Sequence, residues 1–158
     1  MATEQPARAA LAVEARSHSS YPEPYRSRVL PRAARALGDA FGLTRIGINL
    51  VRIEPGKESS MRHWHTHEDE FVYLLEGEVV LRTGSGEQLL TAGMCVGFPA
   101  GCEDGHQLIN RGPGAALFLA VSNRDPADTA YYSDPEVDLV WSPAHARERM
   151  TRRDGTPW

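Results

Sequence analysis

Apolar and polar positions alternate with a period of two over much of the middle of the chain. In residues 46–51, the apolar side chains Ile46, Ile48 and Leu50 occupy every second position, as in a strand with one buried face. We expect further strands at short intervals, over residues 70–75, 78–83, 87–90, 95–98, 106–110, 116–121 and 137–141. Glycine and proline residues between these runs supply the backbone angles of tight turns. Many short strands with no long helix between them indicate an antiparallel sandwich or barrel.

The two ends of the chain lack this alternation. Pro22, Pro24 and Pro31 accompany apolar residues at near-helical spacing, so residues 21–42 fit either a short helix or an extended arm. Beyond Ser142 the chain is charged and has few apolar residues, which indicates a tail or an arm against a partner. We therefore divide the chain into an N-terminal arm that can hold a short helix (1–43), a barrel (44–141) and a charged C-terminal tail (142–158).

Length, charge and cysteine content narrow the function classes. The chain has 158 residues, enough for one domain that folds without disulfides or metals as braces. Its net charge of -4 offers no general attraction to nucleic acid or to an anionic membrane. No segment reaches the ~18 apolar residues of a membrane helix, and Arg8, Glu14 and Arg16 break the N-terminal run before it reaches signal-peptide length. Cys95 and Cys102 cannot form a disulfide framework, so we expect a cytoplasmic protein.

Four arginines with no acidic residue among them form a local exception to the negative charge. They are Arg26, Arg28, Arg32 and Arg35. We interpret them first as a solvated face or an oligomer contact. The alternative interpretation is a role in binding a carboxylate or phosphate group.

The densest chemistry lies in residues 63–70, where three histidines and three carboxylates occupy eight positions. His63, His65 and His67 alternate, so on one extended strand their imidazoles would face the same side. Exposed strands also carry His and Glu, but here the apolar run FVYLL follows at once, so the histidines stand where a sheet enters a core. Imidazole nitrogen beside carboxylate oxygen suits zinc, iron, manganese, nickel or copper better than calcium. The segment therefore predicts a divalent metal site.

Two spaced motifs resemble those of the cupin superfamily. The first combines His63, His65, Glu70 and Gly77, with Gly56 one residue farther from His63 than in the family. The second combines Gly93, Pro99, Gly101, His106 and Asn110, with four residues rather than two between Gly101 and His106, and insertions of this kind in a loop are tolerated. The resemblance covers residues 44–124, about half the chain. It implies an all-β fold, the double-stranded β-helix or jelly-roll barrel, in a small bacterial protein with a single barrel.

The same resemblance implies that His63, His65, Glu70 and His106 ligate the metal. If the strand simply continued, His67 would join the other two histidines and Glu70 would point away, so this ligand set requires a turn or bulge over residues 66–69. His67 then becomes a residue at the rim or behind the ligands, with a ligand role as the alternative. Glu70 could also detach from the metal and act as a catalytic base.

Side chains near the motifs receive supporting roles. Asn110 lies four residues from His106 on the same face of a strand, so we expect it to orient that imidazole. We interpret Trp64, Tyr73 and Phe98 as core or pocket wall. The two cysteines are interpreted as small buried apolar residues, with a redox or ligand role as the alternative.

Four protein ligands leave a position open on an ion that prefers five or six, which indicates chemistry on a bound molecule. We therefore expect a metalloenzyme that acts on a small polar organic substrate by dioxygenase, isomerase or decarboxylase chemistry. The alternative function is a non-catalytic cupin that binds or senses a sugar or a carboxylic acid. The resemblance also implies a homodimer. Nucleic acid and membrane are not expected as partners.

Overall fold

The computed structural model describes residues 7–143 and 150–158. Within them the chain is mainly β-strand, and its helical segments are short: η1 (Ala10–Ala12), α1 (Tyr25–Val29) and α2 (Leu37–Ala40). No helix among these residues has the length and apolar character needed to cross a bilayer. The predicted cytoplasmic location stays a prediction.

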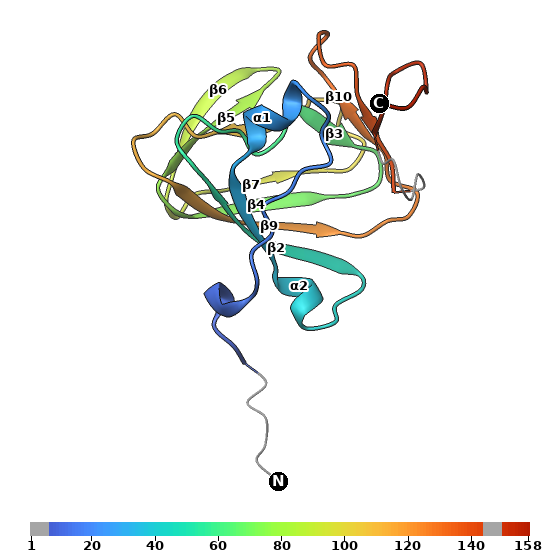
Figure 1. Cartoon of the computed structure of the whole chain (residues 1–158). Helices are drawn as coiled ribbons and strands as arrows, with labels where there is room; N and C mark the ends of the chain where they lie inside the picture. The colour runs from blue at the N-terminus through green and yellow to red at the C-terminus, as the bar shows by residue number, and fades with distance from the viewer. Residues whose placement is uncertain (1–6, 144–149) are drawn as a thin grey trace.

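The strands form three antiparallel sheets arranged in two layers (Figure 1). The five-stranded sheet has the order β1 (Arg32–Ala36), β2 (Ile46–Ile53), β9 (Ala116–Asn123), β4 (Glu70–Glu76) and β7 (Cys95–Phe98). The four-stranded sheet has the order β12 (Met150–Thr151), β11 (Val140–Trp141), β10 (Ala130–Tyr132) and β3 (His63–His65). The three-stranded sheet has the order β6 (Gly86–Thr91), β5 (Glu78–Thr83) and β8 (Gln107–Ile109).

Two backbone hydrogen bonds join the smaller sheets into one layer. The His63 N–H donates to the His106 carbonyl at 3.1 Å, and the His106 N–H donates to the His63 carbonyl at 2.8 Å. The layer so formed faces the five-stranded sheet across the interior. This confirms the predicted all-β jelly-roll fold.

The main core lies between the layers because the alternating apolar residues of each strand face inward. Its buried members are Val51, Ile53, Val72, Leu74, Val79, Leu81, Leu90, Leu108, Ala116 and Phe118. Ile53 and Leu74 are fully buried, so each contributes roughly 1.5 to 3 kcal/mol of apolar transfer free energy. The predicted strands at 78–83 and 95–98 coincide with β5 and β7.

The turn between β4 and β5 requires a glycine. Gly77 has φ of 78°, a conformation that side chains rarely adopt. A Cβ atom at this position would lie 2.7 Å from the Ala115 carbonyl oxygen. Close approach of two backbone segments therefore adds to the conformational demand for glycine here.

The N-terminal arm contains both of the structures that the sequence left open. The short helix α1 comes first, and β1 then pairs along its whole length with β2. The five-stranded sheet therefore begins at Arg32. Strand β1 continues that sheet beyond β2, so it places Arg32 at the edge of the barrel interior.

A second core cluster joins the two ends of the chain. It consists of Tyr21, Tyr25, Val29, Met61, Tyr132, Val137, Leu139 and Met150. Part of the predicted tail thus packs against part of the predicted arm, beside β3. Residues 144–149 of the tail lie outside the described residues.

Candidate metal centre

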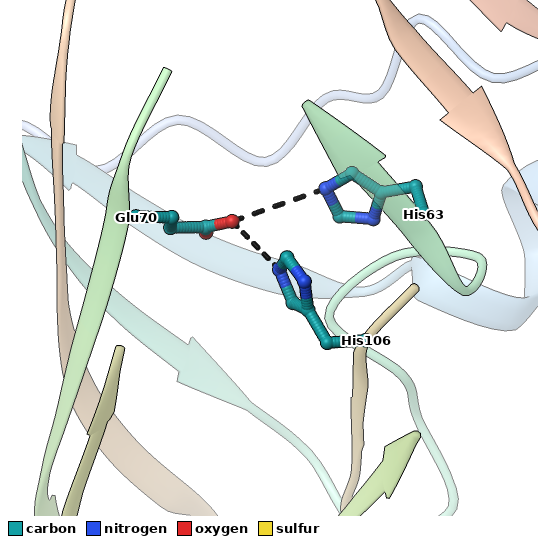
Figure 2. A group of neighbouring side chains, drawn as sticks. All are labelled: His63, Glu70 and His106. Atoms are coloured by element: carbon teal, nitrogen blue, oxygen red, sulfur yellow. Dashed lines mark hydrogen bonds and ion pairs between the residues drawn. The ribbon is translucent and has the colours of Figure 1, made fainter. Parts of the chain in front are cut away.

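The four side chains of the predicted ligand set come from three separate stretches and converge in the interior. His63 and His65 lie on β3, Glu70 begins β4, and His106 directly precedes β8. The Glu70 Oε2 atom lies 2.7 Å from His106 Nε2, 4.0 Å from His63 Nε2 and 3.9 Å from His65 Nε2. Figure 2 shows His63, His106 and Glu70 pointing toward one another. The predicted residues therefore gather around one point.

Two acceptors behind the histidines fix which nitrogen faces that point. His63 Nδ1 lies 2.9 Å from the Met61 carbonyl oxygen, and His65 Nδ1 lies 2.6 Å from Asp128 Oδ2. Because both partners are acceptors, we assign the hydrogen of each ring to Nδ1. The two Nε2 lone pairs then face each other at 3.1 Å. Such an approach is repulsive unless a cation lies between the nitrogens and the carboxylate.

The protonation states also suit a cation. Burial and the neighbouring His106 imidazole lower the pKa of His63 to about 4. Burial raises the pKa of Glu70, but the hydrogen bond to His106 and the surrounding imidazoles outweigh it and lower the value to about 2. Near neutral pH the His63 ring is therefore neutral and Glu70 is ionised, which are the forms that ligate a metal. Three imidazoles and one carboxylate fit a divalent first-row ion. The identity of that ion stays open among zinc, iron, manganese and nickel.

The turn that the ligand set requires is present. Strand β3 ends at His65 and β4 begins at Glu70, so residues 66–69 form the connection. His67 is exposed, and its Nδ1 lies 2.8 Å from the Thr66 hydroxyl. His67 thus lies outside the group of converging donor atoms.

Asp128 is a residue of the candidate site that sequence reasoning missed. It is fully buried, and besides its contact with His65 it accepts hydrogen bonds from the backbone N–H of His67 at 2.8 Å and of Glu68 at 3.2 Å. It therefore holds both the His65 ring and the turn that follows. The surrounding sequence DPADT has the composition of an ordinary turn, so no local signal marks this residue.

Two supporting predictions are wrong. The Asn110 side chain donates to the carbonyls of Ile53 and Gly114 and accepts from the Gly112 N–H. It therefore braces its own loop, while His106 Nδ1 is buried with no partner among the described residues. Tyr73 is 38% exposed and belongs to neither core nor pocket wall.

Of the roles predicted for the other side chains near the motifs, some agree with the structure and others do not. Phe98 stacks on His106 with ring centroids 3.5 Å apart, as expected of a pocket wall. Trp64 lines a cavity beside His65. Cys95 and Cys102 are free and exposed, so their interpretation as buried apolar residues is wrong.

Two cavities meet at the candidate metal centre. One of about 370 Å³ opens between β5, β6 and β7, and its polar lining includes His65, Glu68 and His106. The other, of about 320 Å³, is called the inner cavity below. It is lined by Arg32, Ala34, Asn49, Val51, Ser59, Ser60, His63, Glu70, Val72, His106, Leu108, Phe118 and Ala120. A small molecule in either cavity would contact the residues around Glu70.

Comparison with known proteins agrees with this geometry. A family profile described as Cupin domain matches residues 49–122. A sugar phosphate isomerase of the cupin superfamily from Silicibacter pomeroyi is 42% identical, and the match covers 93% of this chain and 92% of that chain with a TM-score of 0.83. The chain therefore belongs to the cupin superfamily.

Two further solved structures are similar. A candidate sugar phosphate isomerase from Acidithiobacillus ferrooxidans is 36% identical over 69% of this chain and 68% of that chain, with a TM-score of 0.64. A predicted oxalate decarboxylase from Thermotoga maritima shares the fold, at 20% identity over 73% of this chain and 96% of that chain, with a TM-score of 0.60. A search of curated protein sequences returned no match.

Proposed function

We propose that the protein is a metal-dependent isomerase that acts on a small phosphorylated sugar. The observation that carries this proposal is the convergence of three imidazoles and one carboxylate beside an inner cavity. The similarity to a sugar phosphate isomerase, which extends over nearly the whole of both chains, supports isomerisation rather than another metal-assisted reaction.

His63, His65, Glu70 and His106 would hold the metal. A bound divalent ion supplies a Lewis acid that polarises a carbonyl oxygen. Asp128 keeps the His65 ring in the orientation that turns Nε2 toward Glu70, and the Met61 carbonyl does the same for His63. These partners hold the ligands in place before the substrate arrives, which reduces the reorganisation needed during the reaction.

Isomerisation of a sugar moves a proton between neighbouring carbons, so a base is required. Glu70 is the predicted base. Its low pKa means that the carboxylate is ionised and can accept a proton, but a group with a pKa of about 2 is a weak base. Such a carboxylate is better suited to the ligand role, and the catalytic role of Glu70 stays a prediction.

The inner cavity offers space for a substrate of this class. Its volume of about 320 Å³ lies at the lower end of the range of roughly 300 to 1,000 Å³ that is usual for small-molecule sites. Its lining combines polar side chains, among them His63 and Glu70, with the apolar side chains of Val51, Val72 and Phe118. We expect the reacting carbons of the sugar to lie beside His63 and Glu70.

The test begins with elemental analysis of protein purified without a chelator or affinity tag. The protein is then loaded separately with manganese, iron, zinc or nickel and incubated with aldose and ketose phosphates in deuterated water. We expect deuterium to enter the carbon beside the carbonyl and the two sugars to interconvert, which nuclear magnetic resonance detects. His106→Ala should abolish both signals.

Absence of interconversion with every metal would refute the isomerase proposal, as would equal interconversion by the His106→Ala variant. Tight binding of a sugar phosphate without exchange or interconversion would instead support the alternative, a non-catalytic cupin that binds or senses its ligand.

A further inference from the structure

Arg32 brings a positive charge into the inner cavity. In the antiparallel pairing of β1 with β2, Arg32 lies opposite the fully buried Ile53 and Ala34 lies opposite Val51. Residues opposite each other in such a pair point to the same side of the sheet. Arg32 and Ala34 therefore face the interior, and both line the inner cavity together with His63 and Glu70.

The Arg32 guanidinium has few protein partners. Its Nη1 donates to the Ser59 carbonyl at 3.1 Å, and its buried Nε has no partner. Within residues 7–143 and 150–158 no carboxylate forms an ion pair with it. A guanidinium carries five N–H donors, and leaving the other donors unused in a half-buried position is unfavourable unless an anion binds there.

Two serine hydroxyls continue from Arg32 to the candidate metal centre. Ser59 Oγ lies 3.4 Å from Ser60 Oγ, and Ser60 Oγ lies 3.2 Å from His63 Nδ1. The Ser59 hydroxyl accepts a hydrogen bond from the Leu108 N–H. Because these oxygens already accept from N–H groups, the hydroxyl hydrogens remain for each other or for a ligand.

The same three residues also line a second, outer opening. Arg32, Ser59 and Ser60 border a cavity of about 190 Å³ that the N-terminal arm and the C-terminal strands enclose. Arg32 therefore lies between this opening and the ligands around Glu70. An anionic group on one end of a substrate could be bound there while the other end reaches the metal.

The neighbouring arginines differ from Arg32 in their partners or orientation. Arg28 forms an ion pair with Glu58 at 3.0 Å, and Arg26 donates to the Tyr21 carbonyl at 2.9 Å. The buried Nε of Arg35 also lacks a partner, but Arg35 lies three positions along β1 and so faces the opposite side of the strand. Only Arg32 of these four arginines lines the inner cavity.

We propose that Arg32, with the hydroxyls of Ser59 and Ser60, binds the phosphate group of the substrate. This inference rests on the proposed function. It adds the position at which the phosphate group of the sugar would bind. Phosphate fits better than carboxylate because three terminal oxygens can accept from the guanidinium fork and from both hydroxyls at once.

The test measures binding of inorganic phosphate to the full chain by calorimetry, both as purified and after metal loading. The variants are Arg32→Met, Arg32→Lys and the matched control Arg35→Met, which removes an arginine from the other face of the same strand. We expect phosphate to bind about tenfold or more weakly to Arg32→Met than to wild type. Arg32→Lys should be intermediate because it keeps the charge and loses the fork, and Arg35→Met should match wild type.

Two further measurements separate this role from a structural one. Phosphate should raise the unfolding temperature of wild type and of Arg35→Met, but not that of Arg32→Met. Acetate should bind more weakly than phosphate to every variant. Metal affinity should be unchanged in all of them, because Arg32 is not a ligand.

Equal phosphate binding by wild type and both Arg32 variants would overturn the inference, as would acetate binding as tightly as phosphate. Binding that depends on Arg32 in a protein that never isomerises a sugar would uphold it while the isomerase proposal fails. If the Arg32→Met variant isomerises phosphorylated sugars as well as wild type does, the isomerase proposal stands and the inference about Arg32 fails.

Discussion

Replacing Asp128 by asparagine should weaken metal binding even though Asp128 is not a predicted ligand. Asp128 Oδ1 accepts from the His67 and Glu68 N–H groups, while Oδ2 contacts His65 Nδ1. In Asp128→Asn the amide oxygen can keep the two backbone bonds. The amide nitrogen then faces His65 and cannot accept its hydrogen. The substitution therefore affects mainly the contact with His65.

The expected magnitude follows from the change of tautomer. With an N–H donor facing Nδ1, the His65 ring must place its own hydrogen on Nε2, which removes the lone pair that faces the metal. Loss of such a supporting partner typically lowers metal affinity ~10 to 100-fold, which corresponds to about 1.4 to 2.8 kcal/mol. The 2.6 Å contact and the complete burial of Asp128 place our expectation in the upper part of this range.

The assay is competition for zinc between the protein and a chromogenic chelator near neutral pH. Glu103→Gln is the matched control, because it also removes one carboxylate charge but at an exposed position. A double-mutant cycle with His65→Ala tests the route of the effect. If Asp128 acts through His65, then Asp128→Asn should cause little further loss in the His65→Ala background.

Zinc affinity equal to wild type in Asp128→Asn would refute this reasoning. An equal loss in Glu103→Gln would show that overall charge, rather than the His65 contact, controls the affinity. Additive losses in the double variant would mean that Asp128 acts independently of His65.

The remaining predictions concern stability and are checked by chemical unfolding. Burial raises the pKa of Asp134, but hydrogen bonds from Arg62 and Arg82 outweigh it and hold the value below its usual range. Its contribution is therefore present above the ordinary pKa of ~3.9 and lost as the pH falls through the lowered value. Asp134→Asn should cost about 1 to 3 kcal/mol at pH 7 and less near pH 2, and an equal cost at both pH values would contradict this. Gly77→Ala should destabilise the protein by more than about 1 kcal/mol because of the positive φ and the close Ala115 carbonyl, and a neutral effect would argue against that turn. Leu74→Ala, at a fully buried position, should cost about 2 to 5 kcal/mol, and a loss below 1 kcal/mol would be inconsistent with the core described above.

The strands of the barrel could be predicted where the local pattern is strong. Alternation and turn residues mark β5 and β7 at their observed bounds, and they place β2 to within two residues at its end. β10 has three residues and pairs with β3. So short a segment carries no periodicity, and its extended state depends on the partner strand. The helix and the strand within the N-terminal arm likewise depend on what they pack against.

The ligand set could be predicted because its spacing is local to two motifs. His63, His65 and Glu70 stand within eight residues, and His106 occupies a fixed place after a glycine and proline turn. The requirement for a break in the strand before Glu70 also followed from a period of two. The structure brings the donor atoms of these residues together, while metal binding itself stays a prediction that the zinc assay can test.

Asp128 and Arg32 show what only the tertiary structure decided. Asp128 is 63 residues from the His65 ring that it contacts, and Arg32 reaches the inner cavity because β1 pairs with β2. In the sequence, one resembles a turn residue and the other resembles a surface charge. Periodicity and motif spacing depend on neighbours along the chain, so the sequence by itself determined the barrel and its histidine cluster. Contacts between distant segments depend on how the layers pack, so only the folded chain determines which side chains support the predicted ligands and which line the inner cavity.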